Sequence, residues 1–198
     1  MLEVEISVTG QDPTQTQEYR LDREATALKK AGDMDGAIKA LFQRKALMGI
    51  EYRDDKLAKY LQAAGRFDEA LAEIEWLLAT CHAFSFATFA HQPASVIQSQ
   101  RCSQMAGIHA AAVLICQREK RADLQDHHNQ KKETYGSLRQ RLEPLAKADK
   151  KQLEEDLKTA QAQGNTALRT FFQAREERTA KHTADAERMK KAFLGKNT

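Results

Sequence analysis

The sequence predicts an all-α protein built from helical hairpins. The 198 residues contain only three prolines and nine glycines, whereas an all-β fold needs many more residues that reverse the chain. Apolar residues recur at intervals of three and four in several segments, which is the spacing of one face of an α-helix. A segment of about 20 residues also occurs twice at an offset of 33, and such a period is typical of stacked helical units.

The composition excludes several other classes of protein. Hydrophobic residues make up 41% of the chain and charged residues 30%, which is enough for one modest core. The three cysteines have no paired spacing, so we expect a reducing compartment rather than a disulfide framework. The first residues lack the basic start and apolar run of a secretion signal, and no stretch has the roughly 18 apolar residues of a membrane helix. We therefore expect a cytoplasmic protein that makes no membrane contact.

Residues 1–17 form the first predicted segment. Its apolar residues alternate with polar ones, which predicts a short strand; they are Leu2, Val4, Ile6 and Val8. A lone strand needs a partner, so this segment is either an edge used in assembly or a flexible arm.

Residues 18–80 contain two copies of one helical hairpin. The identical pairs are Glu18/Glu51, Tyr19/Tyr52, Arg20/Arg53, Asp22/Asp55, Ala25/Ala58, Leu28/Leu61, Ala31/Ala64, Gly32/Gly65, Asp35/Asp68 and Ala37/Ala70. The glycines stand where the first helix of each unit ends and the chain turns. The second aspartate of each unit then falls at the cap or first turn of the next helix.

The two units resemble a tetratricopeptide repeat. The family pattern has a small residue, a large apolar residue, a glycine, an aromatic residue, a small residue and an apolar residue. It is matched by Ala58, Leu61, Gly65, Phe67, Ala70 and Ile74, and by Ala25, Leu28, Gly32, Met34, Ala37 and Leu41. The period of 33 differs from about 34 in the family, and Gly49 and His82 stand where a proline would close each unit. The resemblance covers about a third of the chain and implies an α–α superhelix.

Residues 81–143 predict a third, degenerate hairpin that caps the stack. Three phenylalanines between residues 81 and 94 break the repeat and are expected to pack back on the hairpins. Pro93 is suited to open the next helix. Helical periodicity continues to about Lys120, and a turn near Arg118 precedes a second predicted helix that ends near Leu142. Two repeats alone bury little core, which is why we expect a third pair. Residues 18–143 therefore form the predicted hairpin-repeat domain.

Residues 144–198 form a basic C-terminal helical extension. Residues 118–198 carry a net charge of +6, whereas residues 1–117 carry −3. Gly164-Asn165 is a predicted break between two long helices, and the polar stretch after Arg175 is expected to protrude or fray. The apolar residues of the last helix have few neighbours in sequence, so the helix folds back on the hairpins of its own chain or of a second chain. We predict the second arrangement, a homodimer.

The sequence contains no catalytic motif and no paired metal-ligand spacing. Cys102, His109 and Cys116 follow one another at intervals of seven on one predicted helix, too far apart to share a metal, and predict a buried seam. The remaining candidates could meet only through tertiary folding; they are Cys81, His82, His91, His127 and His128. Trp76 lies on the flank of an apolar helix face, where it is expected to pack between hairpins. We therefore expect no cofactor, no metal and no enzymatic activity.

The resemblance also implies a candidate binding groove. In tetratricopeptide proteins the first helices line a concave groove that holds a partner peptide. The corresponding residues here are Tyr19, Asp22, Thr26 and Lys29 in the first unit, and Tyr52, Asp55, Lys59 and Gln62 in the second. The alternative is that these repeated residues only begin and cap each hairpin, with the aspartates in the electropositive first turn.

The same positions bear on the chemistry of a partner. Family members that grip a C-terminal carboxylate use lysine and asparagine on the first helices. This chain has Asp22 with Thr26, and Asp55 with Lys59, so such a carboxylate clamp is not expected. A pair of aspartates instead favours a partner segment that carries lysine or arginine.

The leading functional prediction is a non-enzymatic protein–protein interaction module. An adaptor, a dedicated chaperone and an immunity or inhibitor protein all fit this description. The alternative is nucleic-acid binding through the bases of the C-terminal third, which are Lys131, Lys132, Arg139, Arg141, Lys147, Lys150, Lys151 and Lys158. A zinc-dependent enzyme is a third possibility.

Overall fold

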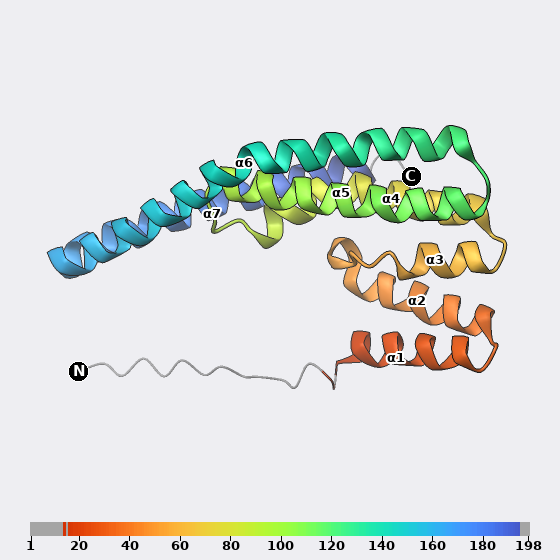
Figure 1. Cartoon of the computed structure of the whole chain (residues 1–198). Coiled ribbons are helices and arrows are strands. Elements are labelled where there is room, and N and C mark those ends of the chain that lie inside the picture. Colours follow the sequence, from red (N-terminus) through yellow and green to blue (C-terminus); the bar gives the residue numbers. More distant parts are fainter. Residues whose placement is uncertain (1–13, 15, 195–198) are drawn as a thin grey trace.

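The computed structural model describes Thr14 and residues 16–194, and within this part of the chain every regular element is helical (Figure 1). The predicted all-α class is confirmed. The predicted strand at residues 2–8 lies outside the described residues. The elements are α1 (Gln17–Lys30), α2 (Met34–Met48), η2 (Gly49–Glu51), α3 (Lys56–Ala63), α4 (Phe67–Thr88), α5 (Ala94–Arg118), α6 (Ala122–Gln163) and α7 (Asn165–Leu194).

Two tight turns produce the first hairpins, α1–α2 and α3–α4. Gly32 and Gly65 adopt φ angles of +87° and +76°, which side chains with a Cβ rarely tolerate, and each follows a helix end as the sequence predicts. Asp33 then caps α2 by accepting a hydrogen bond from the backbone N–H of Gly36 at 2.8 Å. Both turns are therefore encoded locally.

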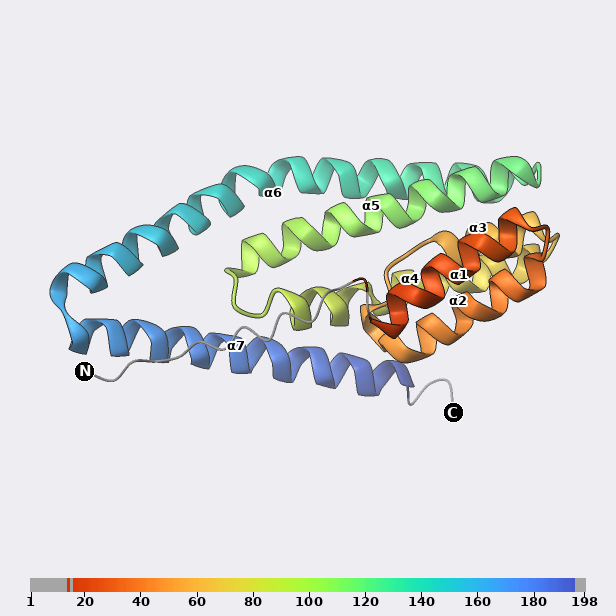
Figure 2. The same ribbon diagram turned by 90° about the horizontal axis from the view of Figure 1, so that it is seen from below.

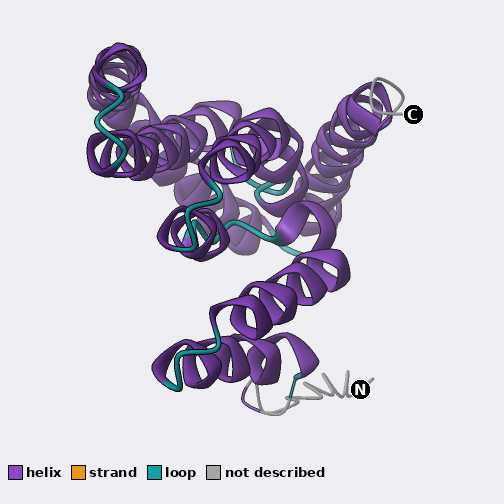
Figure 3. Cartoon of the chain, turned by 90° about the vertical axis from the view of Figure 1, so that its right-hand side faces the viewer, coloured by secondary structure: helices purple, strands orange, loops and turns teal. Residues whose placement is uncertain are grey.

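The helices are arranged as a short stack joined to a longer arm. Helices α1, α2 and α3 lie one above another below α4 and α5, while α5, α6 and α7 extend away from them (Figure 1). Seen along the arm, the α1–α2 end of the stack projects away from the long helices (Figure 3). Each end of the molecule is thus made by a different part of the chain.

One apolar core connects α1 to α5. Its fully or almost fully buried members include Leu41 of α2, Leu57 and Leu61 of α3, Leu77 of α4, and Ile115 of α5. Alanines at the repeated small positions, Ala25, Ala37, Ala58 and Ala70, are also completely buried. Small side chains at these positions let the helices of each hairpin approach closely.

The third pair of helices, α5–α6, follows the sequence prediction in part. Pro93 directly precedes α5, and the turn near Arg118 occurs where expected, with Lys120 at a φ of +55°. Helix α6 differs from the prediction because it continues through Pro144 for 42 residues. A proline removes only one backbone hydrogen bond and bends a helix more readily than it ends it. Helix α6 bends along its length in the view of Figure 2.

Helix α7 folds back along α4 of the same chain. His182 donates a hydrogen bond from Nδ1 to the carbonyl oxygen of Ala90 at 2.8 Å, and its ring meets Phe86 edge-on at 5.6 Å. Ala186 is 2% exposed. In the structure α7 therefore packs on the hairpins of its own chain. The part of α7 that contains His182 and Ala186 neither protrudes nor frays, in contrast to the prediction for the stretch after Arg175. The homodimer, which rested on exchange of this helix, stays a prediction.

Candidate functional site

The first helices of the two units are joined by ion pairs on the face where the sequence predicts a groove. Lys56 at the start of α3 reaches across to α1, where its Nζ lies 2.9 Å from both Asp22 Oδ1 and Thr26 Oγ1. Arg44 of α2 contacts Asp22 at 3.0 Å and Asp54 at 2.8 Å. Asp22 thus connects three helices, and the positive charges of Arg44 and Lys56 compensate its negative charge.

The other predicted groove residues are also paired within the chain. Lys29 Nζ lies 4.3 Å from the ring centroid of Tyr60. Lys59 pairs with Asp55 at 2.7 Å, one turn apart. Gln62 donates to Glu119 at 2.7 Å and so connects α3 to the end of α5. Each of these predicted residues therefore already has an interaction within the chain.

Tyr19 and Tyr52 are not equivalent in the structure. Tyr19 lies in the first turn of α1 and is 38% exposed, whereas Tyr52 precedes α3 and is 0% exposed. The prediction that Tyr52 lines an accessible groove is therefore wrong. Helix α3 begins only at Lys56, and Tyr52 before it packs against Arg44 of α2 and Trp76 of α4 instead of extending the helix. The capping alternative holds for one aspartate only: Asp55 is the N-cap residue of α3, whereas Asp22 lies in the second turn of α1.

Trp76 of α4 lies beside a small apolar pocket. The pocket has a volume of about 190 Å³ and is formed by η2, α4 and the end of α7. Its lining residues are Gly49, Ile50, Trp76, Ala79, Thr80, Ala83, Met189 and Lys190. Every lining residue except Thr80 and Lys190 is apolar, so the pocket suits a hydrocarbon or aromatic group.

A half-buried lysine, paired with a buried glutamate, packs on the indole of Trp76. Lys45 Nζ lies 3.9 Å from a ring centroid of Trp76 and donates a hydrogen bond to Glu73 Oε2. Glu73 is 4% exposed, and burial raises the pKa of its carboxyl while Lys45 acts in the opposite direction. The ring of Tyr52 packs behind the indole at a centroid distance of 6.4 Å. The roles of Lys45 and Glu73 could not be predicted from the sequence, because neither residue belongs to a motif.

Arg53 contacts the wall of the pocket through Thr80. Its guanidinium donates to Thr80 Oγ1 at 2.7 Å and to the carbonyl oxygen of Leu77, and it lies over the ring of Phe84 at 5.3 Å. Burial lowers the pKa of Arg53, although arginine remains charged over any physiological range. Arg53 corresponds to Arg20 in the first repeat. Arg20 is exposed, whereas Arg53 is half-buried and contacts α4.

Cys102, His109 and Cys116 form a packed seam on α5. Cys102, His109 and Cys116 are buried on α5, which confirms the predicted seam. Folding adds a contact that the sequence did not reveal: the Nδ1 atoms of His109 and His128 lie 2.9 Å apart, and Tyr135 stacks on His109 at 5.7 Å. Over the described residues, no group of three or more histidine, cysteine or acidic side chains is placed to hold a metal ion.

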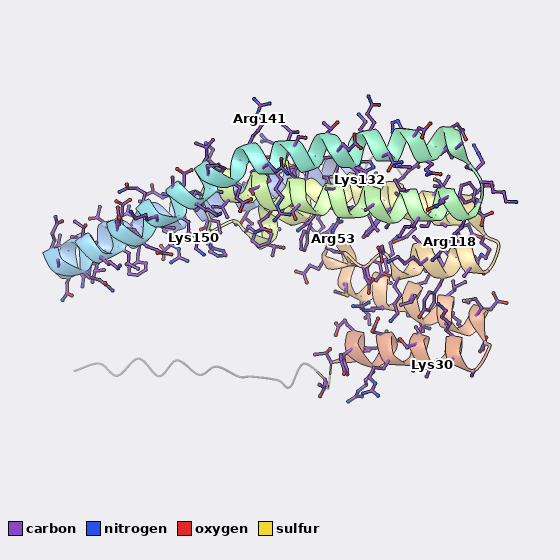
Figure 4. The ribbon with its side chains drawn as sticks, viewed as in Figure 1. Lys30, Arg53, Arg118, Lys132, Arg141 and Lys150 are labelled. Carbon is purple, nitrogen blue, oxygen red and sulfur yellow. The ribbon has the colours of Figure 1, made fainter. Side chains whose placement is uncertain are left out.

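The bases of the C-terminal third are spread around α6. Arg141 and Lys150 project from opposite sides of the helix (Figure 4). Lys147 pairs with Glu143 at 2.9 Å and Lys151 with Glu155 at 3.4 Å. A single continuous surface for nucleic acid, built from all eight predicted bases, is therefore not formed.

Comparison with known proteins assigns no family to the chain. It matches no protein-family model, and no curated protein or solved structure is significantly similar to it. Among the described helices, none is long and apolar enough to cross a membrane. Function is therefore inferred from the chain's own residues.

Proposed function

We propose that this protein is a non-enzymatic binding scaffold that captures a partner protein by inserting one apolar side chain of the partner beside Trp76. The observation that carries the proposal is the apolar pocket of about 190 Å³ between η2, α4 and α7. An adaptor, a dedicated chaperone or an inhibitor of one partner would each use such a pocket. The tetratricopeptide-like arrangement belongs to the same proposal and is supported by the two consecutive hairpins with equivalent glycine turns.

The size of the pocket matches one side chain. An apolar cavity of about 150 Å³ holds a benzene ring, so about 190 Å³ accommodates a phenylalanine ring or a leucine side chain. Large apolar side chains that fill such pockets contribute most of the binding energy in many protein interfaces. The pocket is too small for most cofactors, which favours a protein anchor over a bound coenzyme.

The walls of the pocket are held in place before binding. Lys45 and Tyr52 pack against the indole of Trp76, so little side-chain entropy is lost when a ligand contacts it. The opposite wall includes Met189 of α7, whose flexible thioether adapts to differently shaped side chains. Binding would therefore also tie the end of α7 to α4.

The α1–α3 face suits a partner less well. Its carboxylates are already paired with Arg44, Lys56 and Lys59, so a basic partner segment would have to displace intramolecular contacts. Binding on this face would be a competing possibility with its own prediction: substitution of Tyr19 or Lys59 would then weaken the binding of a partner.

The proposal is tested by selecting displayed random peptides on the full-length chain. Peptides enriched on the protein should share one aromatic or leucine residue. In Ala79→Phe, a new ring fills the pocket from an exposed position on α4, and the dissociation constant of a selected peptide should rise at least tenfold by fluorescence polarisation. Ala72→Phe is the matched control, since Ala72 is exposed on the same helix face two turns away, and its effect should stay below twofold.

Two results would overturn the pocket as the binding site. One is a selected peptide whose affinity is unchanged by Ala79→Phe while both variants keep the helical circular dichroism of the parent. The other is loss of binding in Tyr19→Ala and Lys59→Ala alone, which would place the partner on the α1–α3 face.

A further inference from the structure

A second cleft lies between helices α5 and α6 beside the end of α4. Two side-chain hydrogen bonds join α5 to α6. One links His109 to His128 on the side of the connecting turn, and in the other Ser95 Oγ, near the start of α5, donates to Asp149. Between these two hydrogen bonds lies the cleft, with a volume of about 450 Å³. In Figure 2 the ribbons of α5 and α6 diverge from their connecting turn toward the start of α5.

The α6 wall of this cleft is cationic. Arg139, Lys147 and Lys150 line it together with a single carboxylate, Glu143. All four lie on one side of α6, since their spacing of four, four and three residues follows the helical turn. Within the described residues, no ion pair joins Arg139 or Lys150 to a carboxylate, so the cleft keeps an uncompensated positive charge.

The rest of the lining supplies hydrogen-bonding groups, one phenyl ring and one imidazole ring. Ser99, Gln100 and Ser103 of α5 face the cations across the cleft, and Phe89 and Gln92 close it beside the end of α4. Hydroxyl and amide groups can bind the backbone or the carboxylates of an extended chain. The cleft therefore combines positive charge with donors and acceptors along its length.

The spacing of the cations selects the shape of the ligand. Arg139 lies about 12 Å from Lys147 and about 16 Å from Lys150 along the helix axis, given a rise of about 1.5 Å per residue. One compact anion cannot reach both ends of the row. An extended segment with negative charges four to five residues apart can, because an extended chain rises about 3.3 Å per residue.

We propose that the α5–α6 cleft binds an extended acidic segment of a protein, with its carboxylates at Arg139 and at the Lys147–Lys150 end. Glu143 stands between the cations and would repel a continuous phosphate backbone, whereas a peptide can place an uncharged residue opposite it. The two rings that line the cleft, those of Phe89 and His91, both lie beside the end of α4, so they offer no row of stacking platforms along the cleft for successive bases. This site is separate from the Trp76 pocket and does not depend on it.

The test uses the full-length chain and a labelled peptide with two pairs of glutamates separated by three uncharged residues. A peptide with glutamine in place of glutamate is the ligand control. Arg139→Gln with Lys150→Gln should raise the dissociation constant of the acidic peptide at least tenfold by fluorescence polarisation. The matched variant, Arg141→Gln with Lys158→Gln, removes the same charge from exposed positions of α6 outside the cleft and should change it less than twofold.

Two more variants distinguish binding in this cleft from binding elsewhere on the protein. Glu143→Gln should tighten peptide binding because it removes the carboxylate from the cleft. Ala79→Phe, which fills the Trp76 pocket, should leave binding of the acidic peptide unchanged, whether or not that pocket has a ligand of its own. Equal losses in the two charge variants would overturn the proposal, because they would indicate a general effect of net charge. Tighter binding of a single-stranded oligonucleotide than of the acidic peptide, or equal binding of the glutamine peptide, would also overturn it.

Discussion

Acidification should weaken the α5–α6 hairpin through a pair of histidines. His109 is 4% exposed, and its Nδ1 lies 2.9 Å from Nδ1 of His128. One Nδ1 must donate the proton and the other must accept it, so the hydrogen bond is lost when both rings are protonated. Tyr135 stacks on His109 at 5.7 Å and restricts the ring from moving away.

The magnitude follows from the pKa of His109. Burial, followed by His128, His127 and Lys131, lowers this pKa from 6.5 to about 4. Between pH 6.5 and pH 4 the unfolded chain therefore binds a proton that the folded chain excludes. The stabilisation is complete above pH 6.5 and is lost as the pH falls toward 4, by about 2 kcal/mol at pH 5 and about 3 kcal/mol in full. The pKa of His128 is also lowered, chiefly by burial, although Glu75 opposes the shift.

Urea unfolding at pH 7 and pH 5 measures this loss. The parent protein should lose about 2 kcal/mol of unfolding free energy between these pH values, and His109→Gln should lose less than about 1 kcal/mol. His91→Gln removes a histidine outside the pair and should behave as the parent does. An NMR titration in which His109 protonates at pH 6 or above would contradict this prediction, as would a His109→Gln variant that keeps the full pH dependence.

Three further predictions concern stability and are measured by urea unfolding at pH 7. Gly65→Ala should cost about 1 kcal/mol because φ is +76°, whereas Gly107→Ala inside α5 should gain about 0.5 kcal/mol; equal effects would contradict the backbone argument. Tyr52→Phe should stabilise the protein by about 1 kcal/mol, since among the described residues only the backbone N–H of Leu57 approaches the buried hydroxyl and it forms no regular hydrogen bond there; a loss of stability would mean that this N–H satisfies the hydroxyl. Asp22→Ala and Lys56→Met should show a coupling energy of about 1 kcal/mol in a double-mutant cycle, and a value near zero would mean that solvent screens the pair.

The repeat could predict the hairpins because their signals are local. A glycine in the left-handed region, an aspartate at the start of a helix and a proline before one act through the nearest few residues. Gly32, Gly65 and Pro93 accordingly stand at helix ends, and Asp35 and Asp68 lie in the first turns of α2 and α4 as predicted, although the side chain that caps α2 is that of Asp33. Pro144 shows the limit of such signals, since α6 continues through this residue.

The candidate site could not be predicted in the same way. Tyr19 and Tyr52 occupy identical places in the repeat, yet one is exposed and the other is enclosed by helices that pack on only the second unit. The pocket at Trp76 joins Gly49 to Met189, and the acidic-segment cleft joins Phe89 to Lys150. No pattern within one helix reports contacts between residues so distant along the chain.

The helical class, the repeated hairpins and the positions of most turns can be read from the amino-acid order, because helix periodicity and backbone preferences are properties of short segments. Folding of the whole chain establishes which repeated residues are buried, that α7 lies on α4 of its own chain, and which charges are paired. Those outcomes depend on the relative positions of packed helices, which follow from the entire core rather than from any one segment.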